Sequence, residues 1–271
     1  MRAIAARLAT ALVGMPVVLT LFWVAGNYQL DWLVGLVVSV AGVMAGWEYI
    51  QIVSRLGIPQ PKEFLMMAIP VFLMLSVLWE DYALVAGWGV VYFTVVYSFF
   101  RKGPREGFFA ALAGIFGFLY IPVLLSILYF LHRADFAYVL HFFLIVWGYD
   151  AGAFLVGSAI GKHQLLPRVS LAKTWEGVVG GVVIAMIGAA LLPVFVSDFL
   201  RWLPHVVVLG VWVGTFAQLG DLFESLFKRA AGVKHTGWLL PGHGGMLDRL
   251  DGVLGALPVY FFYMRYVLEL I

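Results

Sequence analysis

The chain has 271 residues, of which 63% are hydrophobic and 12% are charged, and its formal net charge is +2. Soluble globular domains average roughly 45–50% apolar and about 25% charged residues, so the composition excludes that class and is typical of an integral membrane protein. The chain contains no cysteine, which excludes disulfide bonds and thiolate chemistry within it.

The apolar runs are long and uninterrupted, unlike the short alternating segments of a transmembrane barrel. They predict an all-α membrane protein with about nine spans. The spans fall near 8–25, 31–53, 64–80, 82–100, 108–130, 136–158, 176–197, 203–227 and 248–268. The first run follows two arginines, as in a signal peptide, but the eight later runs favour a retained helix. We expect about five N-terminal membrane helices over 1–135 and a second group over 136–271.

Basic residues lie mostly on one side of these spans. Of the 17 Lys and Arg residues, 14 fall in the N-terminus and in segments 54–63, 101–107, 159–175 and 228–249. The other three are Arg133, Arg201 and Arg265. The positive-inside rule then places the N-terminus in the cytoplasm and the C-terminus outside. We therefore expect a multi-pass protein of the inner (cytoplasmic) membrane.

Seven carboxylates lie in or beside the spans, near their cytoplasmic ends. They are Glu48, Asp150, Glu176, Asp221, Glu224, Asp248 and Asp251. A charge at membrane depth costs at least ~2.5 kcal/mol on insertion scales, so such residues usually face a polar cavity. The seven together predict one cavity open to the cytoplasm. For Glu48 and Glu176 taken singly, chance placement at the interface is an alternative.

The segment 162–177 holds one polar cluster on the predicted cytoplasmic side. Ser170 or Thr174 is placed to cap the next helix, with Glu176 in its first turn. Lys173 is poorly placed for helix stability, because it lies near the positive end of the helix dipole. An anion held beside Lys173 would explain its position.

The densest polar stretch is the signature segment, residues 221–251. Its charged side chains recur at helical i, i+3 and i+4 spacings and so share helix faces. One face carries Asp221, Glu224, Ser225 and Lys228, and the next helix carries Asp248 and Asp251. Hard carboxylate oxygens suit Mg²⁺ better than zinc. Nearby basic side chains and glycine-rich backbone amides suit phosphates.

The signature segment resembles that of the CDP-diacylglycerol synthases, also called phosphatidate cytidylyltransferases. Their pattern reads S-x-F-K-R, four residues, K-D, then P-x-H-G-G-x-x-D-R-x-D. The matching positions are Ser225, Lys228, Arg229, Lys234, Pro241, His243, Gly244, Gly245, Asp248, Arg249 and Asp251. The runs starting at Asp150 and Lys173 are also similar, so the resemblance covers Tyr149 to Asp251, whereas the first five spans match only in hydropathy.

Two motifs of the family pattern are not matched in full. His235 stands where the family has Asp, and Leu171-Ala172 stands where the family's S-P-K-K-T has Pro and Lys. If the family's Asp helps to hold the metal or the adjacent lysine, we expect this chain, with His235 in its place, to have lower enzymatic activity. If the position is an exposed loop site, His235 is harmless.

The resemblance implies an enzyme that joins CTP to phosphatidate, giving CDP-diacylglycerol and pyrophosphate. It implies catalytic roles for Asp221, Asp248, Lys228 and Arg249, and Mg²⁺ ligands at Asp221, Asp248 and Asp251, with a second cation left open. The substrate-binding residues would be Asp150, Ser170, Lys173, Thr174, Glu224, Ser225, Arg229, Lys234, His243, Gly244 and Gly245. CTP would arrive from the cytosol and phosphatidate from the inner leaflet of membrane lipid. No nucleic acid is expected, and a homodimer is left open.

Three alternatives compete with this hypothesis. A secondary transporter also carries intramembrane carboxylates, but they usually lie near the midplane, whereas these cluster at one end of the spans. A CDP-alcohol phosphotransferase would show D-G-x-x-A-R, and here Asp251-Gly252 continues with Val-Leu-Gly-Ala. A non-enzymatic scaffold would give the seven carboxylates no role.

The predicted orientation can be tested by labelling, because the chain has no cysteine of its own. Lys102→Cys should react with an impermeant thiol reagent only from the cytoplasmic side, and Arg201→Cys only from the outside. The measurement compares labelling of intact cells with that of inverted vesicles. Labelling of both positions from the same side would contradict the topology.

Overall fold

In the computed structural model, residues 16–191, 199–237 and 244–271 are described, and nearly all of them are helical. They divide into two compact units. The first contains the described residues up to Arg133 and those within Phe227–Leu250, and the second contains Ala134–Leu226 and Asp251–Ile271. His243 and Pro241 of the signature lie outside the described residues.

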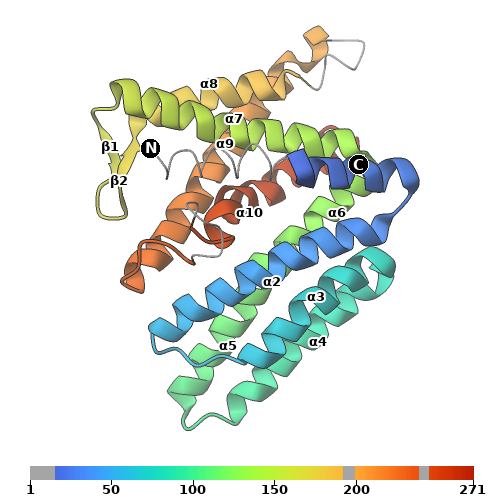
Figure 1. Ribbon diagram of the computed structural model, residues 1–271, viewed down its shortest axis with the longest axis vertical. Coiled ribbons are helices and arrows are strands. Elements are labelled where there is room, and N and C mark those ends of the chain that lie inside the picture. Colours follow the sequence, from blue (N-terminus) through green and yellow to red (C-terminus); the bar gives the residue numbers. More distant parts are fainter. Residues whose placement is uncertain (1–15, 192–198, 238–243) are drawn as a thin grey trace. The chain divides into compact units, whose positions relative to one another are not determined.

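The first unit is built from consecutive helices. They are the helix Pro16–Tyr28, α2 (Asp31–Arg55), α3 (Lys62–Leu78), α4 (Glu80–Phe99), α5 (Pro104–Phe118) and α6 (Leu124–Ala134). Helix α2 packs on α3, α3 on α4 and α4 on α5, while α5 returns to contact α2 and α3 (Figure 1). The Tyr49 hydroxyl of α2 donates to the Ala113 carbonyl of α5 at 2.7 Å. Hydrogen bonding inside the apolar core thus fixes α2 against α5.

A widened helical turn joins α5 to α6 without a break. It spans Leu119–Val123 and contains Pro122, which has no backbone N–H to donate to the preceding turn. Such π-type turns absorb a local mismatch within a longer helix. The combined segment Pro104–Ala134 is long and apolar enough to cross a membrane.

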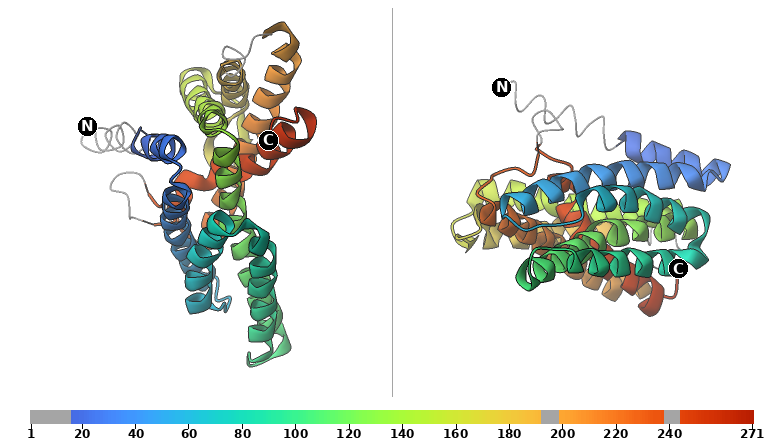
Figure 2. Two further views of the ribbon diagram at one scale, coloured as in Figure 1. Left: turned by 90° about the vertical axis from the view of Figure 1, so that its right-hand side faces the viewer. Right: turned by 90° about the horizontal axis from the view of Figure 1, so that it is seen from below.

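The second unit contains α7 (Phe136–Ile160), strands β1 (Gln164–Leu166) and β2 (Ser170–Thr174), α8 (Trp175–Ala189), α9 (Phe199–Ala230), α10 (Leu247–Phe262) and a π turn, Tyr263–Val267. Helices α7 and α8 lie side by side along their length (Figures 1 and 2). The two strands form an antiparallel hairpin with Gln164 opposite Thr174 and Leu166 opposite Ser170. The last turn of α9 and the first turn of α10 cluster with the first unit.

Glycine allows α9 and α10 to approach closely. A Cβ on Gly220 of α9 would lie 3.1 Å from the Cα of Gly255 and would overlap the backbone of Asp251. A Cβ on Gly255 would lie 2.8 Å from the Cα of Gly220. The two backbones therefore touch beside Asp221, which follows Gly220, and beside Asp251, which lies one helical turn before Gly255, and this contact positions the site.

The helical architecture confirms the prediction of an all-α protein, and its apolar helices fit a membrane protein. Five segments of the described chain are long and apolar enough to span a membrane: Asp31–Arg55, Asp81–Phe99, Pro104–Ala134, Phe136–Ile160 and Leu203–Ala230. Two shorter apolar helices are Pro16–Tyr28 and Trp175–Ala189. The count of nine spans and the orientation stay predictions.

Candidate active site

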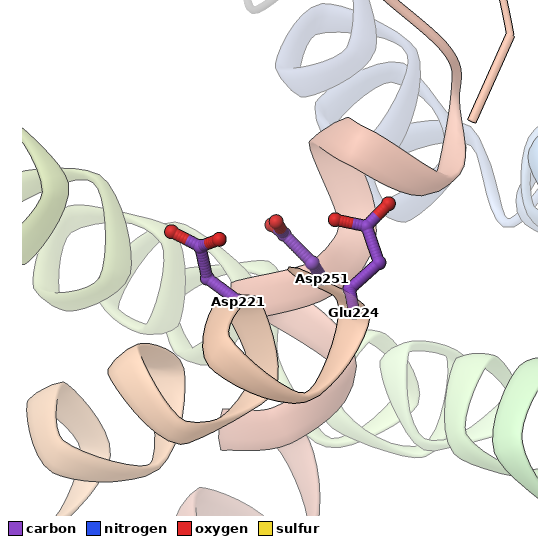
Figure 3. A group of neighbouring side chains, drawn as sticks. All are labelled: Asp221, Glu224 and Asp251. Atoms are coloured by element: carbon purple, nitrogen blue, oxygen red, sulfur yellow. The ribbon is translucent and has the colours of Figure 1, made fainter. Parts of the chain in front are cut away.

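Three carboxylates gather in the second unit. Asp221 and Glu224 come from α9 and Asp251 comes from α10, and one oxygen of each lies within 4.8 Å of the others. Figure 3 shows all three side chains projecting to the same side of the helix pair, with Asp251 between the other two. Glu224 is fully buried, whereas Asp221 and Asp251 are half-buried.

The geometry of this carboxylate group suits a hard divalent cation. Oxygens on opposite sides of Mg²⁺ are about 4.2 Å apart at bond lengths of about 2.1 Å, so small side-chain shifts would bring the three into coordination. Gathered carboxylates also repel one another, and a cation relieves that repulsion. The three residues of the carboxylate group are therefore placed to hold Mg²⁺.

The carboxylates that the structure brings together differ by one residue from the metal ligands that the resemblance implied. The structure brings two of them, Asp221 and Asp251, together with Glu224, which had been expected to bind substrate. The i, i+3 spacing already placed Asp221 and Glu224 on one helix face. It did not show which neighbouring helix would approach that face.

Lys173 lies beside the carboxylate group. Its ammonium is 2.6 Å from the Asp221 carboxylate, and the side chain is 15% exposed. Strand β2 carries Lys173, and Thr174 directly after it caps α8 by accepting a hydrogen bond from the Gly177 N–H at 3.1 Å. The predicted cap is therefore confirmed at Thr174, whereas Ser170 begins strand β2. The anion that explains Lys173 is, within the protein itself, Asp221.

Glu176 joins the hairpin to α8. Its carboxylate accepts hydrogen bonds from the backbone N–H groups of Lys162 and His163, both at 3.2 Å, and lies 2.6 Å from His163 Nδ1. These contacts hold the start of the hairpin against the first turn of α8. Glu176 thus helps to fix the strand that presents Lys173.

A second polar centre lies in the first unit and is built around Asp248 of the signature segment. One oxygen of Asp248 accepts a hydrogen bond from the Lys228 ammonium at 2.6 Å. The other oxygen accepts from the backbone N–H of Gly245 at 2.9 Å and of Thr236 at 3.1 Å. Asp248 therefore holds the lysine of α9 together with Thr236 and Gly245. Sequence reasoning had given Thr236 no role, because its type and spacing carried no signal.

The position that departs from the family lies at the edge of this centre. The Nδ1 atom of His235 is 3.9 Å from Asp248, and the side chain is 54% exposed. Nearby, Gly244 adopts φ +83°, which favours glycine because the residue has no Cβ. His235 is thus a loop residue that approaches a signature carboxylate without a hydrogen bond to it.

The remaining predicted site residues fall into three sets. Ser225 donates to Asp221 at 3.4 Å and so belongs with the carboxylate group. The side chains of Asp150, Arg229, Lys234 and Arg249 are exposed. His243 lies outside the described residues.

Comparison with known proteins agrees with the signature. The profile of the cytidylyltransferase family matches residues 5–267. The phosphatidate cytidylyltransferase of Haemophilus influenzae is 31% identical over 260 residues, covering 86% of this chain and 90% of that protein. That of Staphylococcus saprophyticus is 39% identical over 156 residues, covering 57% of this chain and 59% of the relative. That of Staphylococcus aureus (strain COL) is 46% identical over 125 residues, covering 45% of this chain and 46% of the relative. Because the first and longest of these matches spans most of the chain, the likeness extends into the N-terminal helices.

The carboxylate group makes a prediction about metal binding. Asp221→Asn, Glu224→Gln and Asp251→Asn should each weaken Mn²⁺ binding, measured by electron paramagnetic resonance as a probe for Mg²⁺, at least ~10-fold. Asp81→Asn is the matched control, because Asp81 is an exposed carboxylate at the start of α4. Unchanged Mn²⁺ affinity in all three variants would refute the assignment.

Proposed function

The chain belongs to the cytidylyltransferase family, and we propose that it transfers the cytidylyl group of CTP to phosphatidate, giving CDP-diacylglycerol and pyrophosphate. This step would supply an activated lipid for phospholipid biosynthesis. The observation that carries the proposal is the match to a phosphatidate cytidylyltransferase over 86% of the chain. The carboxylates and lysines of the signature region give that match a chemical basis.

The reaction needs little covalent assistance from the protein. A phosphate oxygen of phosphatidate attacks the α-phosphorus of CTP, and the bond between the α- and β-phosphates breaks to release pyrophosphate. The attacking oxygen belongs to a phosphate monoester, which carries about −1.5 to −2 charge near neutral pH, so no general base is required. The obstacle is repulsion between two polyanions, and catalysis is therefore positioning and charge neutralisation.

The metal would be held by the carboxylate group, Asp221, Glu224 and Asp251. Mg²⁺ bound there would neutralise phosphate oxygens and orient CTP. Asp248 stays in the proposed metal set from the resemblance, and in the structure it accepts from Lys228. The carboxylate group and Lys173 together leave a formal charge of two negatives, which one divalent cation balances.

The basic residues would handle the phosphates. Lys173 and Lys228 are each held in place by a carboxylate, so both ammonium groups are oriented before any substrate arrives. Ammonium and guanidinium groups form strong charge-assisted hydrogen bonds with phosphate oxygens. The full proposed set is Lys173, Lys228, Arg229, Lys234 and Arg249, with Asp150, Ser170, Thr174, Ser225, His243, Gly244 and Gly245 lining the substrate.

The membrane arrangement is part of the proposal. Nine spans with the N-terminus in the cytoplasm would put the basic segments in the cytoplasm, where CTP is found. Phosphatidate would enter sideways from the inner leaflet of the inner membrane. The basic bias of 14 residues against three supports this orientation.

The proposed activity predicts a lipid product that depends on both substrates. Purified protein in mixed micelles should convert α-labelled CTP to labelled CDP-diacylglycerol when phosphatidate and Mg²⁺ are present, measured by thin-layer chromatography. Diacylglycerol in place of phosphatidate should give no product, because it lacks the attacking phosphate. Removal of Mg²⁺ by a chelator should reduce product at least ~100-fold. Label incorporation that is independent of phosphatidate would refute the proposal.

The departure at His235 predicts a gain of function. An Asp at this position would offer hard oxygens near Asp248 and a countercharge to Lys234, so His235→Asp should raise turnover by ~10-fold. The same lipid assay measures it, with Arg168→Asp in the exposed hairpin turn as a control for added negative charge. Turnover and Mg²⁺ dependence unchanged by His235→Asp would establish that His235 is harmless.

A further inference from the structure

A buried glutamate from the N-terminal helices contacts the signature segment directly. Glu48 lies near the end of α2 and its side chain is 2% exposed. Its carboxylate accepts hydrogen bonds from the backbone N–H groups of Met246 and Leu247, both at 2.8 Å. It also accepts from the Thr236 hydroxyl at 2.8 Å. All of these residues belong to the first unit, although nearly 190 positions or more separate them from Glu48 in the sequence.

These contacts give α10 its N-terminal cap. The first N–H groups of a helix have no acceptor within the helix and form the positive end of its dipole. The residue before α10 is Met246, whose apolar side chain cannot accept a hydrogen bond from them. Glu48 supplies from α2 the oxygen that a capping residue supplies locally.

Thr236 connects Glu48 to the catalytic signature. Its hydroxyl lies 2.8 Å from Glu48 and 3.1 Å from Asp248, and a hydroxyl has a single proton to share between them. Asp248 in turn holds Lys228 at 2.6 Å. A continuous chain of polar contacts thus runs from Glu48 through Thr236 and Asp248 to Lys228.

The glycines around the loop fit tightly against the same carboxylate. A Cβ on Gly237 would lie 2.5 Å from Glu48 Oε1, and a Cβ on Gly245 would overlap both Glu48 and Thr236. A larger residue at either position would force the Glu48 side chain or the local backbone to move. Glycine at 245 therefore lets the backbone approach Glu48 closely, which is a reason separate from phosphate binding.

We propose that Glu48 is a positioning residue for cytidylyl transfer: from α2 it fixes Thr236 and the start of α10, so that Asp248 and Lys228 keep their geometry. The inference rests on the proposed function. Glu48 acts through Thr236 and Asp248. The N-terminal helices would then help to set the geometry of Asp248 and Lys228, in addition to forming membrane spans.

Glu48→Gln tests the proposal with little change of shape. The carboxamide replaces one accepting oxygen by an NH₂ group, which faces a backbone N–H and leaves it without an acceptor. We expect kcat to fall ~10- to 100-fold, as for a misplaced reacting group. The KM for CTP should change less than about threefold, because the interaction lost is one that orients the site in the transition state. Glu63→Gln, an exposed glutamate in the first turn of α3, is the matched control and should leave kcat unchanged.

Hydrogen exchange supplies a readout that does not depend on activity. In the peptide covering 244–250, Glu48→Gln should speed amide exchange at least ~10-fold, because one of the two amides, that of Met246 or that of Leu247, loses its acceptor. A wild-type protein that transfers no cytidylyl group would contradict the proposed function. Amide exchange that is unchanged in Glu48→Gln would, independently of activity, overturn the role of Glu48. Faster exchange with unchanged kcat would also overturn it, since the contact would then be structural only.

A second variant, Thr236→Val, tests the same chain of contacts if Glu48→Gln does not fold. It removes the shared hydroxyl and leaves both backbone contacts of Glu48 in place. We expect a fall in kcat of the same order, and in the double variant a loss smaller than the product of the two single losses, because both changes break the same chain of contacts. Unchanged kcat in folded Thr236→Val, or independent losses in the double variant, would overturn the proposal.

Discussion

Charged groups among apolar helices must find their partners within the protein, because lipid offers none. Asp221 pairs with Lys173, Asp248 pairs with Lys228, and Glu48 takes the first amides of α10. Two of these three contacts join segments that are far apart in the sequence. Apolar packing is non-directional, so it tolerates many arrangements of the helices, whereas these few polar contacts favour one. The positions of the hairpin and of the start of α10 depend on them.

The carboxylate group also needs the backbone contact between α9 and α10. Gly220 and Gly255 approach so closely that a side chain on either would push the helices apart. Glycine within a helix costs about 1 kcal/mol relative to alanine, so its presence at a helix crossing reflects packing or function. Here the close crossing brings Asp251 beside Asp221 and Glu224. Three carboxylates from two helices then share one small volume, where local helix geometry alone would have supplied only two.

The sequence predicted what depends on composition and local spacing. Hydropathy predicted helices, the signature predicted the family, and the capping pattern predicted a helix cap at Ser170 or Thr174, of which the structure selects Thr174. It predicted an anion beside Lys173 but not that Asp221 would serve, because a salt bridge across 48 positions leaves no local pattern. The hairpin was missed for a related reason, since its strands are only three and five residues long. Glu48 carried no signal that separated it from an interfacial residue, because its partners lie at the other end of the chain.

The lysine–carboxylate pairs link the two requirements of the proposed reaction. Under the proposed function, a phosphate that drew Lys173 away from Asp221 would leave this carboxylate with an unbalanced charge beside Glu224 and Asp251. A cation at the carboxylate group would then bind more tightly, and reciprocity would require that the cation strengthen phosphate binding by the same factor. Without either ligand, the salt bridge keeps both groups oriented and limits the repulsion among the carboxylates. Such a site would free an ammonium group for a phosphate and a carboxylate for a divalent cation when the two ligands bind together.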